Sequence, residues 1–174
     1  GSKAKNCDDK NKCTKDSCTA KTGKCLNAKI AGCVLLPNLK ASALQPNGAL
    51  PSKLVAGIKI MFKYTRWNNG EATAGIAEDG WYLSTNTVID KKDKLLAKQS
   101  IKALNKGAAY TSFKQIQIPS DTKTGTYYIG YFVDHNNQVK ELVENDNTRF
   151  FKVVVQGQVV KQCTTGVCCD TKTY

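Results

Sequence analysis

Eight cysteines are the residues with the most distinctive chemistry in this sequence. Thiols ligate metals, act as nucleophiles or pair as disulfides, and their spacing helps to separate these uses. The sequence contains no C-x-x-C pair, the usual arrangement at a structural zinc, and its one histidine, His135, lies far from every cysteine. A disulfide role is therefore favoured. The predicted disulfide residues are Cys7, Cys13, Cys18, Cys25, Cys33, Cys163, Cys168 and Cys169.

The segment that holds the first five cysteines is poor in apolar residues. Residues 1–33 contain Leu26 and Ile30 as almost their only large aliphatic side chains. Ordering a residue costs about 1.5 kcal/mol, which so little apolar surface cannot offset. We therefore predict a small module, residues 1–33, held together by disulfides. Because disulfides persist in oxidising compartments, the protein is expected to be secreted or at a cell surface.

The number of cysteines at each end predicts a connection between the ends. Five precede residue 34 and three follow residue 162, so neither group can pair completely within itself. One interpretation is a bridge from Cys33 to Cys168 or Cys169, which would clasp the middle segment and stabilise it. The alternative is that the Cys-rich tail, residues 163–174, is a truncated module and one partner lies outside the sequence.

Two clusters of oxygen-bearing side chains suit a calcium ion, which prefers carboxylate and amide ligands on loops. The first has the D-x-N spacing of a calcium loop, although Thr14 and Ala20 depart from the EF-hand pattern. The second lies between two predicted strands. For both clusters the alternative is that the side chains cap turns. The candidate ligands are Asp9, Asn11 and Asp16 in the first cluster and Asp134, Asn136, Glu141, Glu144 and Asn147 in the second.

The middle of the sequence, residues 34–162, has no cysteine and alternates apolar with polar residues, as half-buried strands do. The period of two recurs in TYYIGYFV and FFKVVV, and more weakly in LKASAL, GWYLST, LLAKQSIKAL and YTSFKQIQI. LLAKQSIKAL could also be a helix, but its short length favours a strand. About seven strands predict an all-β, immunoglobulin-like sandwich. The clearest run, IKIMFKYT, places on one face Ile58, Ile60, Phe62 and Tyr64.

One tyrosine has the position of a known sandwich feature. Tyr127 follows Gly125 by two residues at the start of the TYYIGYFV run. Immunoglobulin-like sandwiches use a tyrosine at such a corner, and its hydroxyl bonds back to the main chain a few residues upstream. We expect the Tyr127 hydroxyl to do the same.

The charge balance is strongly basic, at +12, and all but two of the 26 basic residues are lysines. The lysines are spread over outward strand positions, and the two arginines, Arg66 and Arg149, are too few to read nucleic acid in a sequence-specific way. A diffuse positive field suits attachment to anionic polysaccharide. The alternative is that lysines keep the sandwich soluble and its edge strands unpaired. No apolar run is long enough for membrane insertion.

The sequence offers little for catalysis, because His135 lies in the turn DHNN and no Ser/His/Asp or Cys/His set is visible. We therefore predict that the protein is not an enzyme. An alternative function is a carbohydrate-binding module with an aromatic platform of Trp67, Trp81 and Tyr82, although Trp81 could instead pack in the core.

The landmarks of the middle segment occur in a recognisable order: PNL, GIKIMFKYTRWNNGEATAG, WYLSTNTVIDKKDKLLA and TGTYYIGYFVDHNNQVKELVENDNT. Together they resemble CARDB, the cell-adhesion-related domain found in bacteria, with local departures at Leu142 and Val143. The resemblance implies an immunoglobulin-like fold in an extracellular, often multidomain protein with adhesive or spacing duties. The implied partners are a protein or polysaccharide at a cell surface and other domains of the same parent chain.

The flanks resemble other families over shorter stretches. CDDKNKCTKDSCTAKTGKC resembles small Cys-rich repeats of secreted bacterial proteins, and CTTGVCCD resembles the start of a disintegrin-like module. Both resemblances imply an extracellular setting.

Overall fold

The computed structural model describes residues 5–158, which form ten β-strands and no helix. None of the described residues belongs to a helix with the length and apolar character needed to span a bilayer. The strands are β1 (Thr14–Cys18), β2 (Cys25–Lys29), β3 (Leu39–Pro46), β4 (Leu54–Val55), β5 (Lys59–Asn68), β6 (Ala77–Ser84), β7 (Lys94–Ile101), β8 (Ala109–Gln117), β9 (Gly125–Phe132) and β10 (Thr148–Gln156).

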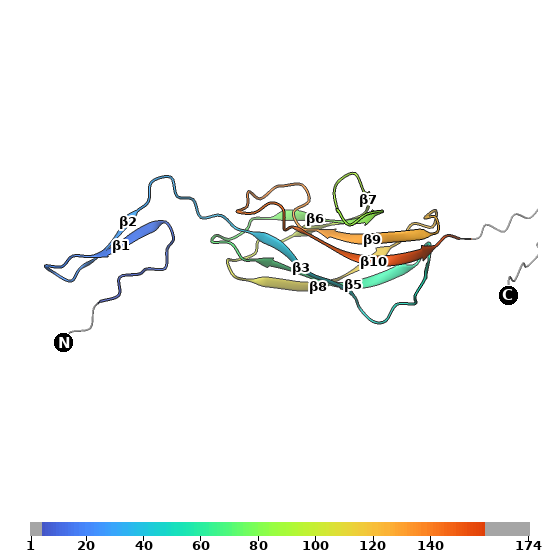
Figure 1. The fold of residues 1–174 in the computed structure, drawn as a ribbon, viewed down its shortest axis with the longest axis horizontal. Helices are drawn as coiled ribbons and strands as arrows, with labels where there is room; N and C mark the ends of the chain where they lie inside the picture. The colour runs from blue at the N-terminus through green and yellow to red at the C-terminus, as the bar shows by residue number, and fades with distance from the viewer. Residues whose placement is uncertain (1–4, 159–174) are drawn as a thin grey trace, which may run out of the picture.

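Eight of these strands form two sheets that pack face to face (Figure 1). The larger sheet has the order β4-β10-β9-β6-β7, and the smaller one has the order β3-β5-β8. All the strand pairs within them are antiparallel except β4 with β10. The all-β sandwich is therefore confirmed, and LLAKQSIKAL is a strand, β7, as predicted.

Alternation along the strands builds the core. Ile60, Phe62 and Tyr64 of β5 are buried, while the intervening Met61 is exposed on the outer face, as the sequence predicts. Between the sheets, the Trp81 ring lies 5.2 Å from that of Tyr64 and 4.9 Å from that of Tyr131. Aromatic rings bury large areas and prefer such tilted arrangements, so these three side chains anchor the centre of the core.

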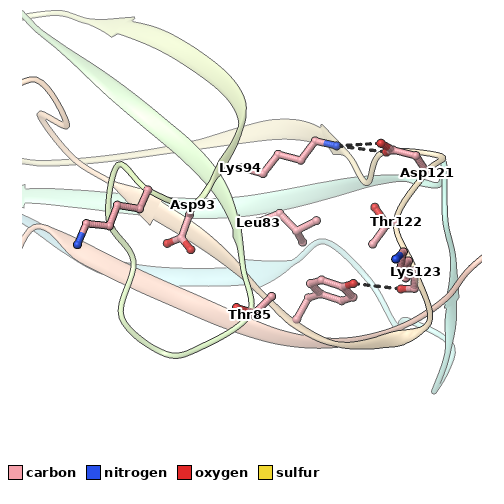
Figure 2. Close-up of a pocket in the computed structure, with 9 residues that line it drawn as sticks. Leu83, Thr85, Asp93, Lys94, Asp121, Thr122 and Lys123 are labelled. Carbon is pink, nitrogen blue, oxygen red and sulfur yellow. Dashed lines mark hydrogen bonds and ion pairs between the residues drawn. The ribbon is translucent and has the colours of Figure 1, made fainter.

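The predicted tyrosine corner is confirmed. The Tyr127 hydroxyl donates a 3.2 Å hydrogen bond to the main-chain carbonyl of Lys123, four residues upstream (Figure 2). The bond closes the turn that leads into β9, and it lies near the surface.

The N-terminal segment is a separate hairpin, β1–β2, held by disulfides between Cys7 and Cys25 and between Cys13 and Cys33. Its two large aliphatic side chains, Leu26 and Ile30, are both exposed, so it lacks an apolar core of its own. The expectation of a disulfide-held module is therefore confirmed.

The predicted bridge from Cys33 to the C-terminal cysteines is wrong, because Cys33 is bonded to Cys13. The hairpin explains this pairing. The Ile30 N–H donates to the Cys13 carbonyl, and the Cys33 N–H donates to the Ile30 carbonyl, so a tight turn folds Cys33 back over Cys13. Within residues 5–158 Cys18 forms no disulfide and is exposed. The cysteines of CTTGVCCD lie outside the described residues.

The polypeptide enters and leaves the sandwich at opposite ends (Figure 1). It enters β3 at Leu39, beside Asn69 and the loop that precedes β10. It leaves after β10 beside Ala56 and Thr124, where Gly157 and Gln158 form hydrogen bonds. The hairpin and residue 158 therefore lie at opposite ends of the sandwich.

We predict that reduction will unfold the hairpin and leave the sandwich folded. The two disulfides close loops of 18 and 20 residues. In the chain-entropy model each closure stabilises the folded hairpin by about 3 kcal/mol. Amide exchange in reductant should therefore lose protection in Thr14–Cys18 and retain it in β5 and β9. A large loss of protection in β5 would contradict this separation.

We also predict that Tyr127→Phe will lower the free energy of unfolding by about 1 kcal/mol, since it removes one net hydrogen bond near the surface. Urea denaturation measures the change. The matched control is Tyr128→Phe, which removes a neighbouring hydroxyl from a ring that packs edge-on against Phe150. Equal effects of the two substitutions would mean that the corner bond adds nothing.

Candidate functional site

A buried ion pair joins the two sheets. Arg66 of β5 and Asp79 of β6 are 3% and 1% exposed, and Nη1 of Arg66 lies 3.5 Å from Oδ2 of Asp79. Asp79 also accepts a 2.6 Å bond from the Tyr131 hydroxyl and a 3.2 Å bond from the Asp134 N–H. Burial raises the pKa of the Asp79 carboxyl, and these partners oppose that shift. Arg66 and Asp79 therefore form a buried polar connection between the two sheets.

His135 lies in a second buried chain of hydrogen bonds. Its Nδ1 is 2.5 Å from the Tyr82 hydroxyl, and its Nε2 is 3.0 Å from Oε1 of Glu78. The bonds from His135 and Lys98 lower the pKa of Glu78. Since both ring nitrogens are engaged and the ring is buried, His135 is held as a structural group.

The second predicted calcium cluster forms the loop between β9 and β10. Asp134 is buried, and its two carboxylate oxygens accept the N–H groups of Gln138 and Val139 at 2.9 and 2.8 Å. Asn136 donates to Glu78 at 3.0 Å, on the outer side of the loop. Asp134 thus fixes the turn of its own loop, and Asn136 connects the loop to β6.

Glu141 connects this loop to the beginning of β3. Its Oε2 accepts the Leu39 N–H, and its Oε1 accepts a 2.8 Å bond from Nδ2 of Asn147. Glu144 accepts the Glu141 N–H at 2.9 Å. Burial raises the pKa of Glu141 to about 7, against the opposing effect of the Leu39 and Asn147 bonds.

Asn38 completes the same junction. Its Oδ1 accepts the Val143 N–H at 2.8 Å, and its Nδ2 donates to Asn69 at 2.8 Å and Asp146 at 3.2 Å. The hydrogen bonds of the second cluster thus hold turns and the beginning of β3 in place. Calcium binding by Asp134, Asn136, Glu141, Glu144 and Asn147 stays a prediction.

The first predicted calcium cluster lies on the hairpin module. Within residues 5–158 one group of acidic side chains has its oxygens within 4.8 Å of one another, and it consists of Asp8, Asp9 and Asp16. Asn11, predicted as a ligand, instead uses Oδ1 to accept the Cys13 N–H. Asp9 accepts the Asn11 N–H and the Thr14 hydroxyl, and these bonds lower its pKa. The structure thus adds Asp8 to the set, and calcium there stays a prediction.

The predicted aromatic platform does not form. Trp81 is 0% exposed because it is the central ring of the core, and Tyr82 is also buried. Trp67 alone of the three is exposed, on the outer face of β5. A sugar platform requires rings that share one surface, so the grouping of Trp67, Trp81 and Tyr82 was wrong.

One pocket, of about 360 Å³, lies beside the Tyr127 corner (Figure 2). An ion pair between Lys94 and Asp121, 3.2 Å apart, spans one side of it. Asp93, also on its wall, accepts the Asp90 N–H at 3.0 Å. The wall holds three lysines and two aspartates in all, so its charge is mixed and does not favour a ligand of one sign.

A second pocket, of about 340 Å³, opens between β7 and β8. Arg66, Gln99, Ser100, Lys102 and Tyr110 contribute to its wall, and we call it the Arg66 pocket. The Arg66 guanidinium carbon lies 4.4 Å from the centre of the Tyr110 ring, a cation–π contact. The buried charge of Arg66 therefore borders both the core and a surface cavity.

Comparison with protein families identifies the sandwich. The family model described as CARDB matches residues 36–150, which is more than half of the chain. The chain belongs to the CARDB family. This match confirms the resemblance noted in the sequence. CARDB is a cell-adhesion-related domain. A model described as a Dictyostelium (slime mold) repeat matches residues 6–30, which include most of the hairpin module.

Solved CARDB structures share the fold. The crystal structure of a Pyrococcus furiosus CARDB domain in complex with di-metal ions is 21% identical, with a TM-score of 0.51 over 69% of this chain and 89% of that one. The solution structure of the same domain is 21% identical, with a TM-score of 0.51 over 72% of this chain and 100% of that one. A domain of a putative cell surface protein from Methanosarcina acetivorans is 17% identical, with a TM-score of 0.48 over 71% of this chain and 95% of that one. No curated protein matches the chain.

The ion pair of the CARDB core was not predicted from the sequence, although a signal for it was present. Continuing the period of two from Ile60, Phe62 and Tyr64 places Arg66 on the same inner face of β5. An arginine at an inward position predicts a buried acidic partner. Asp79 gives the same signal, because it lies on the same face of β6 as Ala77 and Trp81.

We predict that the CARDB domain loses stability as pH rises from about 4.5 to 7. The pKa of Glu141 is about 7 in the folded protein, against 4.5 for an ordinary glutamate, so the native state binds more protons in this range. The free energy of unfolding should therefore fall, by up to about 3 kcal/mol. Urea denaturation at pH 5 and pH 8 measures the difference.

Glu141→Gln should abolish most of this slope, because the amide does not titrate. The matched control is Glu144→Gln, which removes the same charge three residues away and should retain most of the slope, because burial is the larger cause of the raised pKa of Glu141. A slope that persists in Glu141→Gln would assign the effect to another group.

Proposed function

We propose that the chain is a non-catalytic adhesion or spacer module of a larger secreted or surface protein. The observation that carries this proposal is the path of the chain, which enters the sandwich at one end and leaves it at the other (Figure 1). A domain with this path places its neighbours on opposite sides, as a spacer must. Membership of a cell-adhesion-related family supports the same role.

The hairpin module supports the extracellular part of the proposal. Its two disulfides hold a segment with no apolar core, and such segments depend on an oxidising compartment. We divide the protein into this module (1–33), the sandwich (34–162) and a Cys-rich tail (163–174). The tail lies outside the described residues.

The surroundings of His135 support a non-catalytic role. A general base needs a ring nitrogen that can reach a substrate. In this protein Tyr82 and Glu78 occupy both ring nitrogens of His135, and the ring is buried.

The lysines support attachment to an anionic polysaccharide. The net charge is +12, and the outer face of β5 exposes Lys59 and Lys63 on either side of Met61. Such a field attracts a polyanion over long range without fixing one orientation. The attachment is thus expected to be electrostatic, and the sandwich supplies the spacing.

We predict that the protein binds polygalacturonate at low salt and that the affinity falls steadily as salt is raised, because added ions screen the charges. Surface plasmon resonance with immobilised polygalacturonate measures the dependence. Neutral dextran is the matched control and should not bind. Salt-independent binding to dextran would favour the carbohydrate-binding alternative, and no binding to either polymer would overturn the electrostatic part of the proposal.

A further inference from the structure

The Arg66 pocket lies where the two sheets leave a lateral opening. β7 is the last strand of the larger sheet and β8 is the last strand of the smaller one. Gln99 and Ser100 come from β7, Tyr110 comes from β8, and Lys102 follows β7 directly. The pocket is therefore built on strands, and its wall groups are held in place by the sheets.

Arg66 has more hydrogen-bonding capacity than its partners use. A guanidinium carries five N–H donors. Within residues 5–158 the Arg66 side chain makes a single hydrogen bond, the 3.5 Å contact with Asp79, and its buried Nε has no partner. Asp79 in turn divides its two oxygens among Arg66, Tyr131 and the Asp134 N–H. The positive charge of Arg66 is thus only partly compensated from the core side.

Lys102 adds a second positive charge to the same pocket. The lysines nearest to it in sequence are engaged, since Lys98 pairs with Glu78 at 3.1 Å and Lys106 pairs with Glu71 at 2.5 Å. Lys102 is exposed and forms no ion pair among the residues that the structure describes. A cavity with two cations and no carboxylate on its wall favours an anionic ligand.

The other wall groups indicate what else the ligand should carry. The side-chain amide of Gln99 donates a 2.9 Å hydrogen bond to the Tyr64 hydroxyl. The carbonyl oxygen of Gln99 therefore points away from Tyr64 and can accept a hydrogen bond from a ligand. Ile101 and Leu104 supply apolar surface, and Tyr110 is 41% exposed. A sugar ring with one carboxylate and several hydroxyls matches this mixture, because its hydroxyls find partners and its carbon face finds apolar contact. An acidic peptide side chain carries no hydroxyl to donate to the Gln99 oxygen.

We propose that the Arg66 pocket binds one uronic-acid residue of an anionic polysaccharide, with the carboxylate between Arg66 and Lys102. The inference rests on the proposed attachment to anionic polysaccharide and adds to it a defined site. The diffuse lysine field brings the chain of the polymer close, and the pocket selects a single residue.

The test uses trigalacturonate as the probe and the side-chain Nε–H signals of the full protein in nitrogen-15 NMR spectra. The chain has two arginines, so Arg66 and Arg149 give two such signals, and Arg149→Lys assigns them. Trigalacturonate should shift the Arg66 signal in a saturable way and leave that of Arg149 in place. Neutral maltotriose and triglutamate are the matched ligands and should leave the Arg66 signal unchanged.

Two variants separate the pocket from the diffuse field. Ala103 is an exposed residue of the pocket wall, so Ala103→Trp fills the pocket without changing charge and should weaken trigalacturonate binding about tenfold or more. Lys102→Ala should weaken it about fivefold, whereas the charge-matched Lys152→Ala on β10 should weaken it less than about twofold. Calorimetric titration gives these ratios, and retained cooperative melting shows that each variant is folded.

An unmoved Arg66 signal, or full affinity in Ala103→Trp, would overturn the inference. Salt-dependent binding of polygalacturonate would then remain, and the proposed function with it. An equal Arg66 shift with triglutamate would overturn the sugar class. If trigalacturonate shifts the Arg66 signal but polygalacturonate does not bind, the diffuse electrostatic attachment is refuted and the pocket proposal stands.

Discussion

The contact between Arg66 and Asp79 is the interaction on which the other polar features of the domain depend. Two charges inside a sandwich are costly unless they face each other, so the pair fixes how β5 lies against β6. Removing one partner of a buried pair costs about 3–5 kcal/mol, because the other is left uncompensated. Asp79 then holds the Asp134 N–H, which begins the loop that carries Glu141. Glu141 holds Leu39, and thereby the place where the chain joins the sandwich.

Much of the fold could be predicted because burial imposes a period of two on strands. The inner faces of β5 and β9, the outward Met61 and the Tyr127 corner all follow from local alternation and turn chemistry. The pairing of Cys33 could not be derived in this way. It depends on the register of β1 with β2 and on a tight turn, which cysteine counts do not encode.

The polar residues were harder to interpret than the apolar ones, since the same side chains suit different roles. Asp134 and Glu141 have the oxygens of a metal site, but in the fold they accept main-chain N–H groups. Which role a carboxylate takes depends on donors that are distant in sequence, such as Leu39. The Arg66 pocket is of the same kind, because β5, β7 and β8 must all be in place before its residues meet.

The path of the chain also has a mechanical consequence. Tension applied at residues 38 and 157 pulls β3 and β10 outward along their own axes, in opposite directions (Figure 1). β3 is paired with β5, and β10 is paired with β9, over most of their lengths. A pull along the strands loads each of these ladders in shear, so their hydrogen bonds must break together and cannot peel apart one at a time. The sandwich is therefore arranged to carry force between residues 38 and 157 with little extension until a whole ladder fails.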